Sequence, residues 1–225
     1  MATPHRSAPA RRPVGRPAGP TEQGATSRQR ILDAAATVFA QVGYDRARMA
    51  DVVETSGMTK GSVYFHFENK EALAVAVLTE KHAQWLDRVQ ARLASAPAGR
   101  GRLEELLPAM LELHRADPDA WVISRLTQNL AEMPETRTLA TELTRSWIDT
   151  VANIIRDGQY SNDMDGTVAP ELLATVLVGA FDGVKTTVEM VSDDRHAADA
   201  QLEAGGALLL TMMRSVVPNG RALED

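Results

Sequence analysis

The chain has 225 residues, no cysteine and a formal net charge of −6 at pH 7. Its length and 44% hydrophobic content allow a large core, and the lack of cysteine excludes disulfides, thiolate metal sites and thiol nucleophiles. No uncharged apolar run approaches the ~20 residues that a membrane helix needs, and the basic first residues lack the apolar region of a secretory signal. We therefore predict a cytoplasmic protein.

The charges are divided unevenly along the chain. Residues 1–70 hold 10 Lys and Arg against 6 Asp and Glu, a balance of +4, which leaves 14 against 24, a balance of −10, for residues 71–225. A basic front on an acidic body is typical of a DNA-binding head joined to a separate regulatory body.

The first segment, 1–24, is predicted to be a disordered basic arm, because it is rich in proline and arginine and poor in large apolar side chains. The stretch Val14-Gly15-Arg16-Pro17 resembles half of a Gly-Arg-Pro element, which would place Arg16 in an A·T-rich minor groove. A basic tail that only adds salt-sensitive affinity for DNA explains the segment equally well.

Residues 25–70 predict a three-helix DNA-binding domain. Ser27 can cap a first helix that runs to about Gln41. A helix-turn-helix motif follows at about 48–67, in which Gly57 ends one short helix and Thr59 caps the next, from Lys60 to about His66. The second helix of such a motif can lie in a DNA major groove.

The second helix of this motif has one apolar side and one polar side. Val63 and Phe67 are four residues apart and can both point inward. Hydroxyls and lysine suit base edges or phosphates, and glycine permits close approach of the backbone. The residues that face outward or flank the helix are Thr59, Lys60, Gly61, Ser62, Tyr64 and His66. A packed helical hairpin with a solvated polar face is the alternative explanation of the same pattern.

The rest of the chain, 71–225, reads as a larger helical bundle. Apolar residues recur at helical spacing in segments 70–95, 103–116, 118–132, 135–158, 170–191 and 197–217. With the head this gives an all-α protein of about nine helices. The last two helices are unusually apolar and contain glycines that a close helix–helix contact would explain, either within the chain or across a two-fold dimer interface. These glycines are Gly179, Gly183, Gly205 and Gly206.

Candidate ligand-binding residues lie on inward faces of this bundle. Three tryptophans, Trp85, Trp121 and Trp147, are placed on apolar faces, where they serve either as core residues or as the walls of a pocket. The polar candidates are Lys81, Gln128 and Asp182. A buried aspartate must be paired, hydrogen-bonded or neutralised, so Asp182 is a structural ion pair, a solvated position or a ligand anchor.

Motifs for catalysis, cofactors and metals are missing from the sequence. Its five histidines are scattered, and it has no HExxH, GxSxG, P-loop or dinucleotide-binding pattern. The polar loop 160–166 lacks the glycine and the glutamate of a calcium loop. We predict no enzyme activity, no cofactor and no metal.

The stretch TSGMTKGSVYFHFENKEAL resembles the signature of the TetR family of transcriptional repressors, and the likeness covers about residues 26–85. It implies a homodimer that pairs through its last two helices. It also implies DNA contacts by Thr59, Lys60, Gly61, Ser62, Tyr64, His66 and Lys70. Arg48 stands where family members commonly have a Thr or Ser cap, which removes about 1 kcal/mol of capping energy and adds a cation near the phosphates.

The body resembles the γ-butyrolactone receptors of the same family through LTRSWIDTVANIIRDG and LLATVLVGAFDGVKTTVEMVSD. Trp147 falls on the tryptophan of that ligand pocket, whereas Asp182 and Lys81 replace residues that are often Thr and Gln. The likeness implies a repressor that binds a semi-palindromic operator and is released by a small molecule, γ-butyrolactone-like or related. The alternative is a helical binding or scaffold module without sequence-specific DNA recognition.

Overall fold

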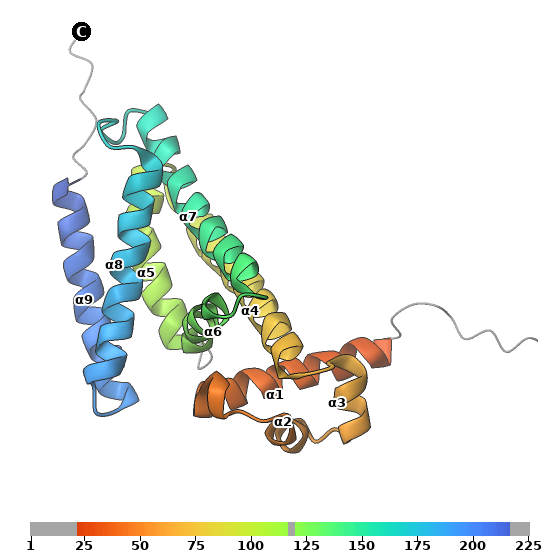
Figure 1. Cartoon of the computed structure of the whole chain (residues 1–225). Helices are drawn as coiled ribbons and strands as arrows, with labels where there is room; N and C mark the ends of the chain where they lie inside the picture. The colour runs from red at the N-terminus through yellow and green to blue at the C-terminus, as the bar shows by residue number, and fades with distance from the viewer. Residues whose placement is uncertain (1–21, 117–119, 217–225) are drawn as a thin grey trace, which may run out of the picture.

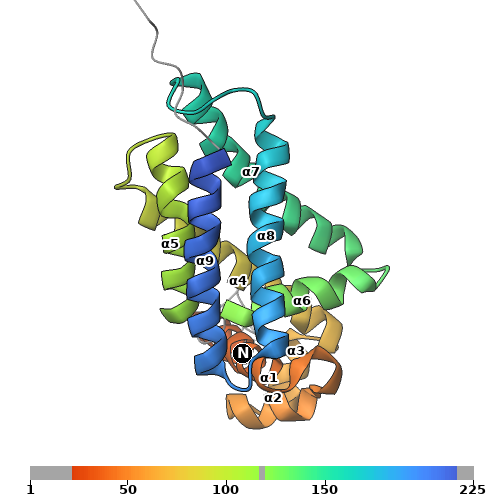
Figure 2. The same ribbon diagram turned by 90° about the vertical axis from the view of Figure 1, so that its left-hand side faces the viewer.

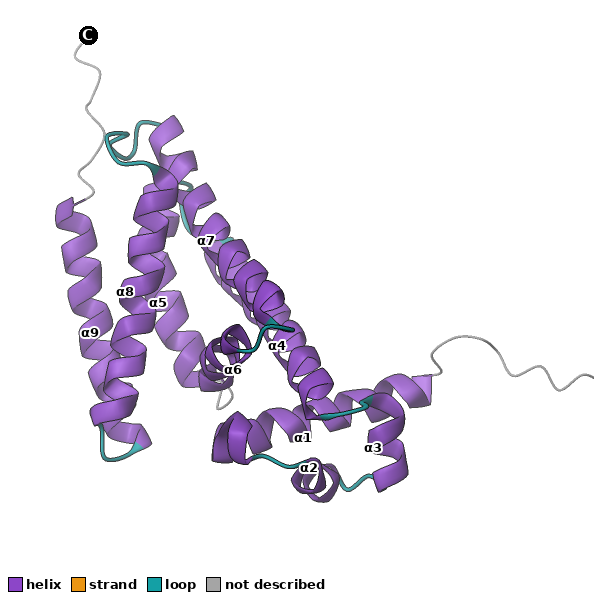
Figure 3. Cartoon of the chain, in the orientation of Figure 1, coloured by secondary structure: helices purple, strands orange, loops and turns teal. Residues whose placement is uncertain are grey.

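The computed structural model describes residues 22–116 and 120–216. Within these ranges the chain forms nine helices and no strand (Figure 3). The all-α prediction is therefore confirmed. The helices are α1 (Glu22–Arg46), α2 (Met49–Ser56), α3 (Lys60–His66), α4 (Lys70–Leu93), α5 (Arg100–Ala116), α6 (Ala120–Glu132), α7 (Arg137–Tyr160), α8 (Pro170–Val191) and α9 (Arg195–Val216). Most of the predicted arm, including Arg16, lies outside the described residues.

Helices α1, α2 and α3 form a small head at one end of the molecule (Figure 1). The prediction that Ser27 caps α1 is wrong. The helix begins at Glu22, and the Ser27 hydroxyl donates to the carbonyl of Gln23, 2.8 Å away and four residues back along the chain. A serine inside a helix can satisfy its hydroxyl in this way. Gly43 interrupts the helix near its end, with a φ of 77°.

Helix α4 runs from the head into the body without a flexible linker (Figure 1). Its start is fixed by Asn69, whose side-chain oxygen accepts a hydrogen bond of 2.7 Å from the Ala72 amide. Leu73, Val77 and Leu78 are at most 1% exposed and pack into the core of the head, whereas Val89 packs into the body. The same helix thus belongs to both hydrophobic cores.

Helix α6 also joins the core of the head. Val122, Leu126 and Leu130 are at most 1% exposed and pack in one cluster with Ile31 and Phe39 of α1. The two hydrophobic clusters therefore do not divide at the predicted boundary between residues 70 and 71. A helix from the middle of the chain completes the core on which the DNA-binding motif stands.

Helices α8 and α9 lie side by side and form the outer layer of the body (Figure 2). Their inward residues, among them Phe181 and Leu202, join the core of the body. Their outward face exposes the large apolar side chains of Leu172, Val176, Met190, Leu208 and Met212. In the described part of the chain, no helix is long and apolar enough to cross a membrane.

Candidate DNA-binding surface and effector cavity

The turn between α2 and α3 has the geometry of a helix-turn-helix motif. Gly57 ends α2 with a φ of 64°, a conformation that only glycine adopts without strain. The Thr59 hydroxyl oxygen accepts a hydrogen bond of 3.1 Å from the Ser62 amide and so caps α3. Both of these expectations for the motif are confirmed.

At the start of α2 an aspartate takes the place of a hydroxyl cap. The Arg48 amide donates to the Asp51 carboxylate at 2.9 Å, and the guanidinium of the same arginine pairs with that carboxylate at 2.8 Å. These bonds hold the pKa of the Asp51 carboxyl below its ordinary value. An acidic side chain in the first turn replaces the missing cap, as in half of a capping box.

Helix α3 presents its polar side to solvent. Val63 is fully buried and Phe67 is 5% exposed, so both apolar residues point inward as predicted. Most of the predicted DNA-binding residues lie on the opposite side: Thr59, Lys60, Gly61 and Tyr64 are exposed, and Ser62 and His66 are half-buried. A face free of neighbouring helices can approach a major groove.

Phe65 is a surface residue that the sequence patterns did not single out. It is 78% exposed, next to Tyr64 on α3. An exposed phenylalanine on a recognition helix can contact the methyl group of thymine. The signal that could have found it is the run Tyr64-Phe65-His66-Phe67, in which only Phe67 is needed for the core.

Lys70 occupies a more structural position than its neighbours on the motif. Its ammonium donates to the carbonyls of Tyr44 and Asp45, at 2.8 and 3.2 Å, and lies 4.4 Å from the centre of the Tyr44 ring. These contacts tie the start of α4 to the end of α1. A contact of Lys70 with DNA stays a prediction.

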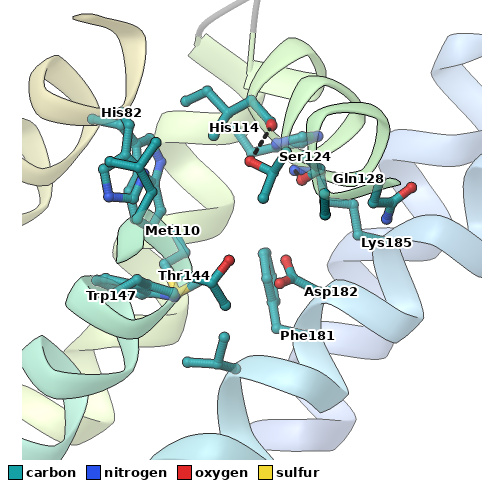
Figure 4. Close-up of a pocket in the computed structure, with 16 residues that line it drawn as sticks. His82, Met110, His114, Ser124, Gln128, Thr144, Trp147, Phe181, Asp182 and Lys185 are labelled. Atoms are coloured by element: carbon teal, nitrogen blue, oxygen red, sulfur yellow. Dashed lines mark hydrogen bonds between the residues drawn. The ribbon is translucent and has the colours of Figure 1, made fainter. Parts of the chain in front are cut away.

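The body contains a cavity of about 320 Å³ between α4, α5, α6, α7 and α8 (Figure 4). Its walls are partly aromatic: Trp85 and Trp147 meet edge to face, with ring centres 4.5 Å apart, and Phe181 contributes a third ring. A volume of this size and a lining that combines aromatic walls with polar side chains are typical of small-molecule sites.

The predicted ligand-binding residues separate into two groups. Trp85, Gln128, Trp147 and Asp182 line the cavity. Two others are not among its lining residues. The Lys81 ammonium lies 3.7 Å from the carboxylate of Asp33 on α1. The Trp121 ring is 3% exposed and packs against the His114 ring, with 4.4 Å between ring centres.

Several polar lining residues were missed by the sequence patterns, namely His82, His114, Ser124, Thr127, Thr144 and Lys185. They are single polar residues on otherwise apolar helix faces, and they come from five different helices. Only the position of Lys185, three residues after Asp182 and so on the same side of a helix, could have indicated it.

Lys185 lies deep in the wall of the cavity. It is 6% exposed, its ammonium donates to the Ser124 hydroxyl, and the same ammonium lies 5.5 Å from the centre of the Trp121 ring. Burial lowers the pKa of Lys185 to about 8, and the negative charge of Asp182 only partly opposes this. For Asp182 the effects are reversed: burial raises the pKa of its carboxyl, and Lys185 partly opposes the rise.

Two histidines also face the cavity in their neutral form. Burial, followed by the positive charges of Lys185 and Arg195, lowers the pKa of His114 to about 3. Burial alone lowers the pKa of His82. The Nε2 atoms of both rings have no hydrogen-bond partner among the described residues.

The four glycines of the last two helices have different surroundings. A Cβ on Gly205 would come within 2.7 Å of Val184, and one on Gly206 within 2.6 Å of Leu111, so close packing within the chain explains both. A Cβ on Gly179 or Gly183 would meet nothing within 4 Å. Only this second pair lies open for a dimer contact.

Groups of three or more acidic or histidine side chains that could hold a metal ion do not occur in the described ranges.

Comparison with known proteins identifies the relatives of this chain. The sequence profile described as "Bacterial regulatory proteins, tetR family" matches residues 31–77, which contain α2 and α3. The HTH-type transcriptional repressor AcnR of Corynebacterium diphtheriae is 30% identical over 69% of this chain and 77% of its own length.

Two further relatives are a receptor protein and a solved structure. The A-factor receptor protein of Streptomyces griseus is 28% identical over 71% of this chain, and the match spans 54% of that receptor. A solved structure from work on the control of antibiotic production by bacterial hormones is 28% identical, with a TM-score of 0.71 over 85% of this chain and 97% of its own. With its helix-turn-helix head and helical body, the chain belongs to the TetR family of transcriptional regulators.

Proposed function

We propose that this protein is a repressor whose homodimer binds a semi-palindromic operator through α3 and is released when a small molecule enters the cavity. In such a dimer, two copies of α3 must reach successive major grooves, about 34–36 Å apart. A ligand that favours a dimer with a different head spacing would lower operator affinity by a shift in population. The relatives of the chain support this function over that of a scaffold module.

The observation that carries the proposal is the double role of α6. One side of the helix, with Leu126, packs into the core of the head. Another side, with Ser124 and Gln128, lines the cavity. A ligand that pushes α6 therefore pushes the core on which α1 and α3 rest.

Arg125 reinforces this connection between α6, the head and α8. Its guanidinium donates to the carbonyl of Ala40 on α1 at 3.3 Å and pairs with the carboxylate of Glu189 on α8. One side chain thus links the head to both a wall of the cavity and the apolar outer layer. A displacement of α6 against α8 would strain both contacts.

The open face of α8 and α9 supports the homodimer. Apolar side chains such as Leu172, Val176 and Leu208 are 57–62% exposed there, and Gly179 and Gly183 leave room for a second copy. A contiguous exposed apolar patch on a protein of this kind is typical of an interface. We place the dimer contact on this face.

The effector that we propose is a small diffusible molecule with an apolar part. The likeness to the A-factor receptor supports this class, and the cavity has the volume for it. The aromatic pair Trp85 and Trp147 would form the apolar wall against it.

The test is binding of the purified protein to the DNA upstream of its own gene and to scrambled DNA, at two salt concentrations, with and without an extract of the producing cells. We expect a specific complex that survives the higher salt and dissociates when the extract is added. Equal, salt-labile binding to both DNAs would contradict the proposal, because charge alone would then account for the affinity.

A further inference from the structure

The opening of the cavity is marked by three of its lining residues. Gln128 on α6, Thr144 on α7 and Asp182 on α8 are exposed residues although they line the cavity. The cavity therefore opens between these three helices. Asp182 as a whole reaches solvent, while the protein atoms around its carboxyl shield that group enough to raise its pKa. Figure 4 shows Thr144 and Trp147 approaching from α7, Asp182 and Phe181 from α8, and Gln128 from α6.

Each of these three residues offers an oxygen that can accept a hydrogen bond. The carboxylate of Asp182 can only accept hydrogen bonds, and Lys185 is the cation that acts on it electrostatically. The Thr144 hydroxyl donates its proton to the Ala140 carbonyl at 2.9 Å, so its oxygen faces the cavity as an acceptor. Gln128 adds an amide carbonyl.

The ammonium of Lys185 does not fully neutralise the carboxylate of Asp182, because it is bonded to another side chain. Its ammonium bonds to Ser124 and lies over the ring of Trp121, which is not a lining residue. The positive group is thus held deep in the wall, while the negative group lies at the opening.

On one side the cavity leads into an apolar space, although His82, His114 and Lys185 line other parts of its wall. A second, smaller space of about 40 Å³ adjoins it and shares four of its walls, Met110, Trp147, Val178 and Phe181. Its other walls are apolar as well, including Leu106 and Met213. A ligand whose polar group stays at the opening would therefore place an apolar tail against the tryptophans and toward this space.

We propose that the effector carries a primary ammonium group and an apolar tail. An ammonium has three N–H donors and no acceptor, which matches three acceptors and one negative charge at the opening. The aromatic rings behind it add a favourable surface for a cation. This inference rests on the proposed function, because it assigns a ligand class to the same cavity, and it replaces the neutral lactone with an amine.

The experiment compares four probes with the same six-carbon tail: hexylamine, hexyltrimethylammonium, 1-hexanol and hexanoate. Binding to the full-length protein is followed at pH 7 through tryptophan fluorescence, since Trp85 and Trp147 are two of the three tryptophans. We expect hexylamine to bind at least about tenfold more tightly than the other three, because only it supplies both the charge and the donors.

The variants Asp182→Asn and Asp149→Asn separate a local effect from a change in net charge. Asp149 lies exposed on α7 and does not line the cavity. Asp182→Asn should remove the preference for hexylamine while leaving the affinity for 1-hexanol within about twofold, and Asp149→Asn should change neither. Tighter binding of hexanoate, or a preference that survives in Asp182→Asn, would overturn the amine assignment.

The same titrations are repeated with the protein bound to operator DNA. Release by hexylamine supports both proposals. Release by cell extract when hexylamine shows no preferential binding overturns the ligand class and leaves the repressor function standing. Preferential binding of hexylamine without release from DNA supports the ligand class and contradicts the ligand-released repressor function.

Discussion

The DNA-binding surface and the effector cavity are built in different ways. The surface comes from one short stretch, 59–66, whose cap, turn and buried residues are all neighbours in sequence. The cavity collects side chains from five helices, between His82 and Lys185. The difference shows that a local site can be inferred from spacing, whereas a site between helices depends on how the helices pack.

The two regions meet at α6, and the largest effect that we expect comes from breaking this contact. Leu126→Ala removes a fully buried side chain from the core of the head. It should lower the free energy of unfolding by about 2–5 kcal/mol, as buried leucines do elsewhere. It should also weaken operator binding at temperatures where the variant is folded, because α1 and α3 rest on the same core.

Leu202→Ala is the matched control for this change. Leu202 is 2% exposed and packs in the core of the body. Urea denaturation should show a similar loss of stability, with operator affinity unchanged for the folded protein. Equal loss of operator affinity in both variants would mean that α6 has no special connection with the head.

The second effect concerns the surface alone. Lys60→Ala removes an exposed cation from α3 and should weaken binding of each subunit to the operator by about 1–3 kcal/mol. The circular dichroism spectrum and the melting temperature should not change. Arg115→Ala removes the same charge from an exposed position on α5 and should leave operator affinity unchanged. Unaltered operator binding by the Lys60→Ala variant would rule out α3 as the recognition helix.

The third effect concerns the cavity alone and depends on pH. His114 has a pKa of about 3 in the folded protein, against 6.5 ordinarily. Between these values the unfolded chain binds the proton and the folded chain does not, so stability falls as the pH drops below 6.5. The loss from this group should be about 1.4 kcal/mol at pH 5.5.

The measurement is urea denaturation at pH 7.5 and 5.5, for the wild type and for His114→Gln, which has no ionisable group. The substitution also removes the ring contact with Trp121, which itself affects stability. The quantity compared is therefore the difference in the free energy of unfolding between the two pH values in each protein. An identical pH dependence in both proteins would mean that folding does not shift the pKa of His114.

Much of the head could be predicted because its structure follows from single residues. Gly57 and Thr59 are enough to predict the turn and the start of α3 without any tertiary contact. Ser27 misled the prediction because a hydroxyl can bond inside a helix as well as cap it.

The body was predictable as helices and only partly as a site. Trp147 and Asp182 were identified from their places on inward helix faces, with family likeness adding support for Trp147, and both line the cavity. Trp121 has the same apolar surroundings in sequence and packs against His114 instead. Whether a side chain lines the cavity or packs in the core depends on the orientation of its helix. That orientation is set by contacts between segments that lie far apart in the chain.

The smallest effect tests how local the head is. Thr59→Ala removes the hydroxyl that caps α3 and should lower the free energy of unfolding by about 1 kcal/mol. Thr59→Ser keeps the hydroxyl and should restore most of this stability, as urea denaturation can show. If Thr59 also contacts DNA through its hydroxyl, operator affinity should follow the same order, with the serine variant close to the wild type. An alanine variant that is as stable as the wild type would mean that packing of Val63 and Phe67 holds α3 in place without its cap.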